Sequence, residues 1–144
     1  MIGDTIMIVP CTFRFYKKDW VHSNMNLAIR IANENENKFR FGCILTHGGR
    51  IIAEAQNHMG KSHPLQAKYA KRAGEGNKIW LHAEIRALIQ ARETPEEIWI
   101  ARIWRDGSLA LAKPCAICTL AIQESGIEKI HYTNEFGKIT TVEV

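Results

Sequence analysis

The chain has 144 residues, of which 46% are hydrophobic and 24% are charged, and it carries a formal net charge of +4. These values suit one folded domain over 1–144 that needs no disulfide or structural metal, and they exclude a disordered chain. Arg or Lys interrupts the apolar stretches, and the N-terminal "MIGDTIMIVPCTFRF" lacks a secretory pattern. We therefore expect a cytoplasmic protein with no membrane partner.

Helical and extended patterns alternate along the first half of the chain. Apolar residues at helical spacing predict a helix over 23–36, and the segment 39–57 predicts a hairpin that turns at a pair of glycines. The stretch 58–79 looks largely irregular, with a short helix expected over 66–72. Loops of this length inside a compact domain tend to be functional.

The second half continues the alternation and predicts the overall class of fold. The expected elements are a helix over 82–92, a strand over 97–104, a helix from Pro114 to Gly126, and strands over 127–133 and 139–144. This order predicts an α/β sandwich on a mixed sheet. We expect the hairpin to be antiparallel and the later strands to run parallel through helical crossovers.

Two short motifs open the helices expected at 82 and 114. The first, "HAE", holds His82 and Glu84, and the second, "PCAIC", holds Cys115 and Cys118. Residues three apart share a helix face, and a helix N-terminus lowers the pKa of thiols, so the two cysteines can bind one ion. With His82 as a nitrogen ligand, this set favours tetrahedral zinc with a fourth position open to water, which is typical of a catalytic site.

Glu84 is the candidate proton carrier. On a regular helix it would point about 200° around the axis from His82, so we do not expect it to be a ligand. Near the start of the helix its carboxylate can reach across the mouth of the site and carry a proton from water to a substrate nitrogen. The alternative, a structural zinc, needs a further ligand from Cys11, Cys43 or His131. We interpret both of these cysteines as buried apolar residues.

The "HAE" and "PCAIC" motifs together resemble the cytidine deaminase superfamily, whose signature is H-x-E with P-C-x-x-C. The resemblance covers most of the chain, from "GRIIAEAQN" to "SGIEKIHYT". It implies a three-layer α/β/α sandwich around a mixed sheet of about five strands, and a homo-oligomer. It also implies that His82, Cys115 and Cys118 bind zinc and that Glu84 is the general acid and base of a hydrolytic deamination. Lys113, before the proline, departs from the pattern of better-known subgroups.

Four further residues are candidate substrate contacts. Asn57 matches a position at which members of the superfamily often contact the sugar or the base, and Ala83 lies inside the first motif. Trp80 could stack on a base, and His63 could bind phosphate or line the pocket. A core position for Trp80 and a surface position for His63 fit the pattern at least as well.

The basic residues suggest the class of substrate. Residues 58–80 hold five Lys or Arg and one Glu, which equals the whole net charge of +4. A phosphate could bind here, although a solvated charged face is an equal alternative. Few aromatic residues are interleaved, which favours a small cytosine nucleotide or nucleoside over single-stranded nucleic acid. Deamination of cytosine or adenine in nucleic acid, and a non-catalytic zinc-bearing binding module, stay open as alternatives.

Overall fold

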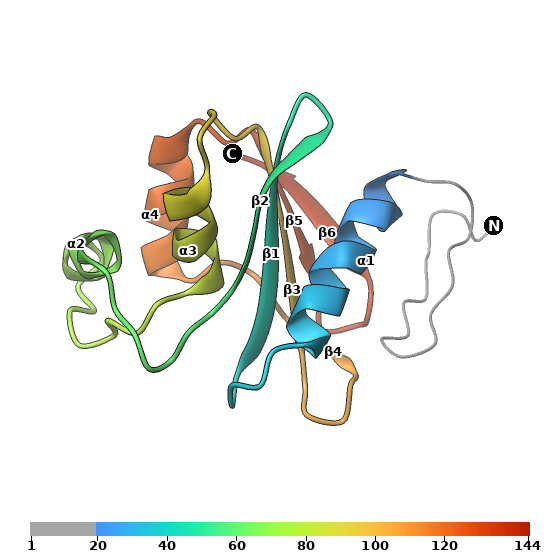
Figure 1. Cartoon of the computed structure of the whole chain (residues 1–144), viewed down its shortest axis with the longest axis horizontal. Coiled ribbons are helices and arrows are strands. Elements are labelled where there is room, and N and C mark those ends of the chain that lie inside the picture. Colours follow the sequence, from blue (N-terminus) through green and yellow to red (C-terminus); the bar gives the residue numbers. More distant parts are fainter. Residues whose placement is uncertain (1–19) are drawn as a thin grey trace.

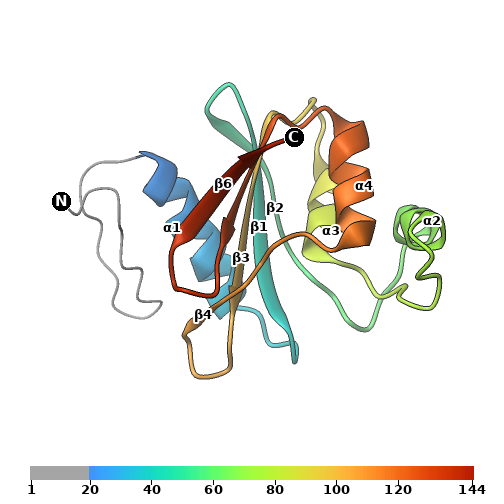
Figure 2. The ribbon, with the colours of Figure 1, turned by 180° about the vertical axis from the view of Figure 1, so that it is seen from behind.

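The structure is a computed structural model that describes residues 20–144, so Cys11 lies outside the described residues. A sheet separates α1 (Trp20–Asn33) from α2 (Pro64–Arg72), α3 (Ala83–Gln90) and α4 (Ala116–Ser125), as Figure 1 shows. The view from behind in Figure 2 shows the same division, with α2 farthest from the sheet. The predicted three-layer α/β/α sandwich is confirmed. Among the described residues, no helix has both the length and the apolar character needed to cross a bilayer.

The sheet is mixed and contains six strands in the described chain, in the order β2-β1-β3-β5-β6 with β4 paired to β3. Their bounds are β1 (Arg40–His47), β2 (Arg50–Gln56), β3 (Glu97–Ile103), β4 (Leu109–Ala110), β5 (Lys129–Thr133) and β6 (Ile139–Glu143). β4 pairs with β3 beyond the residues that pair with β5, so the sheet stays five strands wide. β3 and β5 are parallel as expected, but β6 returns antiparallel to β5, so the expectation that the later strands are all parallel is wrong there.

The ends of several elements differ slightly from the expected ones. α1 begins earlier than predicted, and α3 ends at Gln90. α4 begins at Ala116 because Cys115 caps it, so Pro114 lies before the helix and not in its first turn. The hairpin turn is confirmed, with Gly48 and Gly49 both at positive φ, as a two-residue turn of this type requires.

Close packing of α1 on the sheet depends on Gly42 in β1. A Cβ atom at this position would overlap the carbonyl oxygen of Ala28 and lie 2.6 Å from the backbone nitrogen of Ala32. The missing side chain lets the helix approach the strand directly. The apolar residues of α1 then pack against one face of β1 and β3, including the fully buried Trp99.

The opposite face of β3 points toward α3 and α4. Ile98 and Ile100 belong to the core on this side, whereas Trp99 and Ala101 belong to the core under α1. Because side chains alternate along a strand, Arg102 continues the row of Ile98 and Ile100. It therefore lies on the α3 and α4 side, at the carboxyl end of β3.

Candidate active site

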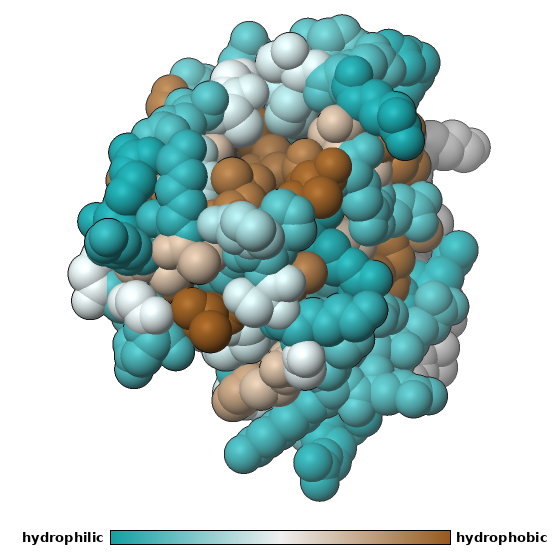
Figure 3. Space-filling model, turned by 60° about the vertical axis from the view of Figure 1, so that its left-hand side comes forward, coloured by the Kyte–Doolittle hydropathy of each residue, from teal (hydrophilic) through white to brown (hydrophobic). Residues whose placement is uncertain are grey.

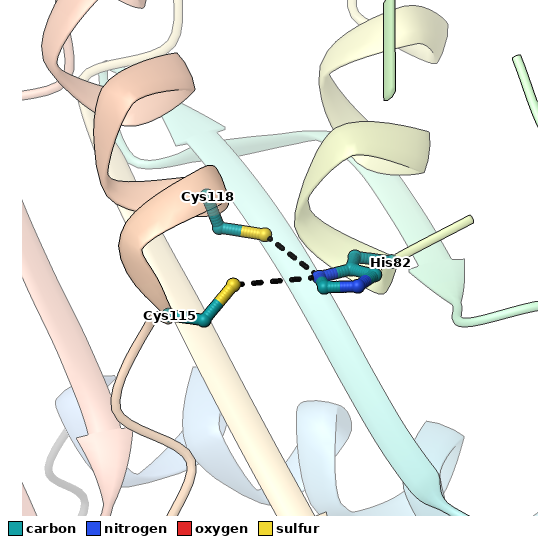
Figure 4. A group of neighbouring side chains, drawn as sticks. All are labelled: His82, Cys115 and Cys118. Atoms are coloured by element: carbon teal, nitrogen blue, oxygen red, sulfur yellow. Dashed lines mark hydrogen bonds between the residues drawn. The ribbon is translucent and has the colours of Figure 1, made fainter. Parts of the chain in front are cut away.

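The structure brings His82, Cys115 and Cys118 together at the starts of two helices. His82 is the N-cap of α3, Cys115 is the N-cap of α4, and Cys118 lies in the first turn of α4. The Nδ1 atom of His82 lies 3.3 Å from the Sγ atom of Cys118 and 3.6 Å from that of Cys115, as Figure 4 shows. All three ligand atoms lie within 4.8 Å of one another, so these residues could hold one metal ion. We call them the metal-ligand cluster.

The charges in the metal-ligand cluster fit a divalent cation. The hydrogen bond with Cys118, followed by the hydrogen bond with His82, lowers the pKa of Cys115 to about 4, against the effect of burial. Burial raises the pKa of Cys118 well above its ordinary value, and the hydrogen bond with Cys115 adds to this. One sulfur is thus a thiolate and the other a buried thiol. A bound cation is the group that stabilises both as thiolates, and two sulfurs with one imidazole are a donor set that suits zinc.

Glu84 lies beside the metal-ligand cluster, as the second residue of α3, and only 5% of its surface is exposed. His82 has extended backbone angles, φ −78 and ψ 153, so it stands outside the helix. The angle of about 200° expected on a regular helix does not apply, and both side chains line the same cavity. Burial raises the pKa of Glu84, and the charge of Cys115 raises it further. A carboxyl group in such a place can take up and release a proton.

The cavity has a volume of about 390 Å³, which is in the range of small-molecule sites. Its lining combines the metal-binding, aromatic and charged residues: His82, Ala83, Glu84, Cys115, Ile117, Phe39, Phe41, Asn57, Trp80, Glu75, Lys78, Arg102 and Lys113. Figure 3 brings the α2, α3 and α4 side of the molecule forward and shows hydrophobic patches there, bordered by hydrophilic residues. The cavity is therefore a small, partly aromatic chamber next to the metal-ligand cluster.

Three aromatic side chains form one wall of this cavity, which we call the aromatic wall: Phe39, Phe41 and Trp80. The ring of Trp80 lies 4.2 Å from that of His82, measured between centroids, and stacks on Phe39 at 6.4 Å with planes 22° apart. Trp80 is therefore in the cavity wall, where a flat heterocycle could pack against it.

Asn57 holds the aromatic wall in place. Its side-chain Nδ2 donates to the carbonyl oxygen of Phe39 at 2.9 Å, and its Oδ1 accepts from the backbone N–H of Phe41 at 3.1 Å. The same Oδ1 accepts from the side chain of Asn35 at 2.6 Å. Asn57 is 1% exposed, and these bonds fix its orientation. It lines the cavity, as a substrate contact would, but its acceptor atom already accepts hydrogen bonds from Phe41 in β1 and from Asn35 in the loop before β1.

The structure places His63 at the start of α2 and not in the cavity wall. It caps the N-terminus of α2, where its Nδ1 accepts a hydrogen bond from the backbone N–H of Leu65 at 3.0 Å. It is not among the residues that line the cavity. The candidate role in substrate binding is therefore not supported, and a capping side chain at the surface describes His63 better.

The basic stretch 58–80 divides into two parts. Lys78 lines the cavity, and its ammonium group pairs with Glu75 at 2.7 Å. The other four basic residues of this stretch do not line the cavity and are exposed: Lys61, Lys68, Lys71 and Arg72. Most of this charge is a solvated face.

Several residues of the site were not predicted from the sequence, namely Gln66, Arg102 and the cavity-lining residues Phe39, Phe41, Glu75 and Ile117. Gln66 is fully buried, and its Oε1 accepts from the backbone N–H of His82 at 3.1 Å, which positions the N-cap of α3. Arg102 lines the cavity from β3. A sequence signal existed for Arg102, since it is a charged residue in phase with Ile98 and Ile100 in an otherwise apolar strand.

Among the described residues, neither of the further ligands that a structural zinc would need, Cys43 and His131, joins the metal-ligand cluster. Cys43 lies in the apolar core, and burial raises its pKa well above the ordinary value. His131 bonds to Glu97 at 2.6 Å and to Thr141 at 2.7 Å, next to Trp99. Within residues 20–144 the cluster has three ligands, as an open zinc site requires.

The fold and the site together define a zinc-dependent hydrolase of the deaminase class. The family model for the cytidine and deoxycytidylate deaminase zinc-binding region matches residues 18–134. The chain therefore belongs to this family, whose cofactor is zinc and whose members hydrolyse C–N bonds.

Solved structures show the same fold. The dCMP deaminase of the cyanophage S-TIM5 in complex with dCMP and dUMP is 22% identical, with a TM-score of 0.58, and the match covers 83% of this chain and 85% of that one. The apo form of the same enzyme is also 22% identical, with a TM-score of 0.57 and coverage of 83% and 86%. A comparison with curated proteins finds no significant match.

Proposed function

We propose that this protein hydrolyses the exocyclic C–N bond of cytosine in a small nucleotide or nucleoside, which converts the base to uracil and releases ammonia. The observation that carries the proposal is the placement of the metal-ligand cluster and Glu84 in the wall of one cavity of about 390 Å³. The metal site lies at one side of a chamber suited to a single nucleotide. Family membership and the nucleotide ligands of the cyanophage enzyme support the same substrate class.

The residues of the chain have distinct roles in this reaction. His82, Cys115 and Cys118 hold zinc, which when bound supplies the Lewis acidity that makes water a nucleophile near neutral pH. Glu84 accepts a proton from the attacking water and donates it to the ring nitrogen beside the amino-bearing carbon. Water adds to that carbon, and the amino group leaves as ammonia after it has been protonated. Trp80 and Ala83 line the space beside these groups.

A small substrate is favoured over nucleic acid by the position of the basic residues. Four of the five in the stretch 58–80 are exposed outside the cavity, and Arg72 already pairs with Glu124. A strand of nucleic acid would need a continuous basic and aromatic path that leads to the metal site. Three aromatic residues, Phe39, Phe41 and Trp80, instead line the cavity itself.

The test compares the zinc-loaded protein with Glu84→Gln, which keeps the shape of the side chain and removes its proton chemistry. We expect the variant to keep one zinc per chain and to lose about 10²- to 10⁴-fold in kcat, the usual contribution of a general acid and base. Glu54→Gln, an exposed carboxylate on β2, is the matched control and should keep full activity.

Ammonia release should be measured with cytosine and adenine substrates as free base, nucleoside, nucleotide and single-stranded oligonucleotide. Full turnover by Glu84→Gln would contradict its role as the proton carrier. Zinc-loaded wild type that releases no ammonia from any of these substrates would overturn the proposal and favour a zinc-bearing binding module.

A further inference from the structure

Arg102 is an unusual cation in the cavity. Its guanidinium carbon lies 5.7 Å from the ring centroid of Phe39, 5.3 Å from that of Phe41 and 4.7 Å from that of Trp104. Its side chain has no ion pair or hydrogen bond with any residue of the described chain 20–144, and burial lowers its pKa. An arginine stays charged in proteins even so. The cavity therefore contains a partly desolvated positive charge that has no anionic partner among the described residues.

The aromatic rings offer no acceptor to the N–H donors of Arg102, and no described residue accepts a hydrogen bond from its side chain. Guanidinium groups stack on rings through their flat faces, whereas their N–H donors point outward in the plane. Two of the three rings, Phe39 and Phe41, are held by the side chain of Asn57 through their own backbone atoms. The guanidinium is thus kept in place by a wall that is itself fixed. A planar, preorganised fork of donors matches the oxygens of a phosphate group.

The wall also connects Arg102 with the metal-ligand cluster. Trp80 lies against His82, Phe39 stacks on Trp80, and Arg102 lies against Phe39. All four line the same cavity. A nucleotide could place its base near the metal-ligand cluster and its charged end near Arg102, along one continuous aromatic surface.

The other two cations of the cavity are weaker candidates. Lys78 is already paired with Glu75. Lys113 is exposed, so its charge is solvated. The basic stretch 58–80 supplies Lys78 alone to the cavity lining, so the recognition of an anion there depends on a residue from β3.

We propose that Arg102 is the specificity residue that binds the phosphate of a pyrimidine nucleoside monophosphate, so that the monophosphate is preferred over the nucleoside. This inference rests on the proposed deaminase function and names the substrate form of the same site. A phosphodiester of single-stranded nucleic acid offers similar oxygens. The small volume of the cavity and the exposed position of the remaining basic residues favour the monophosphate.

The experiment compares wild type with Arg102→Gln, Arg102→Lys and the matched control Arg105→Gln, which alters an exposed arginine that does not line the cavity. Each zinc-loaded protein is assayed with deoxycytidine, dCMP and a short cytosine oligonucleotide. We expect Arg102→Gln to lower kcat/KM for dCMP about 10- to 100-fold, as the loss of charge-assisted hydrogen bonds implies, and to change that for deoxycytidine less than about threefold. Arg102→Lys should recover only part of the loss, because lysine lacks the planar fork.

Three outcomes would overturn the inference and leave the deaminase function intact. The first is an equal loss for dCMP and deoxycytidine, which would indicate a structural role for Arg102. The second is a wild type with no preference for dCMP. The third is that the oligonucleotide is a better substrate than dCMP and that its turnover depends on Arg102 as strongly as the turnover of dCMP does.

Measurements of ligand binding distinguish a failure of this inference from a failure of the proposed function. If the wild type deaminates nothing, calorimetric titration with dCMP and deoxycytidine still decides the role of Arg102. Tighter binding of dCMP that is lost in Arg102→Gln would support phosphate recognition in a protein without the proposed activity. Equal binding of both ligands would overturn it.

Discussion

The metal-ligand cluster and the aromatic wall face the same cavity but are built in different ways. The cluster comes from the starts of α3 and α4, where helix N-termini stabilise the negative charge of a thiolate and of Glu84. The aromatic wall comes from the loop before β1, the start of β1 and the segment before α3, and the position of Phe39 and Phe41 depends on the buried side chain of Asn57. One side is organised by charge at helix ends and the other by a network of amide hydrogen bonds.

This difference predicts that chemistry and recognition can be separated by mutation. Changes in the metal-ligand cluster should remove the metal and the reaction while the core stays intact, since its residues lie at helix ends. Changes in the support of the aromatic wall should weaken the fold and substrate binding, since they leave buried polar groups without partners.

Cys118→Ser should remove the reaction. Cys118 is a buried member of the metal-ligand cluster, and serine is a poor ligand for zinc. Because even the outer partners of metal ligands contribute about 10- to 100-fold in affinity, we expect zinc affinity to fall about 100-fold or more. The measurement is the zinc content per chain after dialysis against a chelator, together with ammonia release.

Cys43→Ala is the matched control for this change. Cys43 is also a buried cysteine, but it lies in the apolar core and not in the metal-ligand cluster. It should keep the zinc content of the wild type and lose only stability, by about 1 kcal/mol. A Cys118→Ser protein that held zinc as strongly as Cys43→Ala would disprove the assignment of Cys118 as a ligand.

Asn57→Ala should destabilise the protein. The change leaves the Phe39 carbonyl, the Phe41 N–H and the Asn35 side chain without their common partner. We expect the free energy of unfolding to fall by about 2–4 kcal/mol, measured by urea denaturation. Zinc content should be kept and KM should rise, because the ligands stay in place and the aromatic wall does not.

Asn77→Ala is the control for this variant, since Asn77 is exposed, and its change should stay within about 0.5 kcal/mol. An Asn57→Ala protein as stable as the control would show that the network does not hold the wall. In that case Asn57 would be a substrate contact alone.

The two sides of the cavity also differ in how far the sequence predicts them. The metal-ligand cluster was predictable because each motif is local: His82 and Glu84 are two residues apart, and the cysteines are three apart, at recognisable helix starts. The same local patterns predicted the hairpin and most helices. They misplaced the start of α4, because a capping Cys115 and a helical Pro114 fit the sequence equally well.

Trp80 and Asn57 were candidate contacts from the sequence, but the rest of the aromatic wall and its support could not be predicted because their contacts join distant segments. Asn57 bonds to Asn35 across 22 positions, and Arg102 meets Phe41 only because β3 pairs with β1. Gln66 supports His82 from another helix. No local spacing encodes these contacts. For the same reason the basic stretch 58–80, which is prominent in the sequence, was a poor guide to the charges in the cavity.

The smallest expected effect concerns a contact between α2 and α4 that lies outside the cavity. The carboxylate of Glu124 accepts a hydrogen bond from the hydroxyl of Tyr69 at 3.0 Å and pairs with Arg72. The Arg72 guanidinium, followed by the Tyr69 hydroxyl, holds the pKa of Glu124 below its ordinary value of 4.5. The unfolded chain therefore binds this proton more tightly, and the stability from the contact is present above about pH 4.5 and lost as the pH falls through the folded pKa.

The measurement is urea denaturation of wild type and Glu124→Gln at a series of pH values. The difference in free energy of unfolding between them should be constant above about pH 5.5 and shrink as the pH falls below about 4.5, because both side chains are then neutral. Glu135→Gln, an exposed carboxylate in the turn between β5 and β6, should show no such trend. Neither variant should alter kcat/KM at neutral pH. A loss of activity in Glu124→Gln would mean that Gln66 of α2 positions His82 only while the contact between α2 and α4 is intact. The metal-ligand cluster would then also depend on contacts between distant segments.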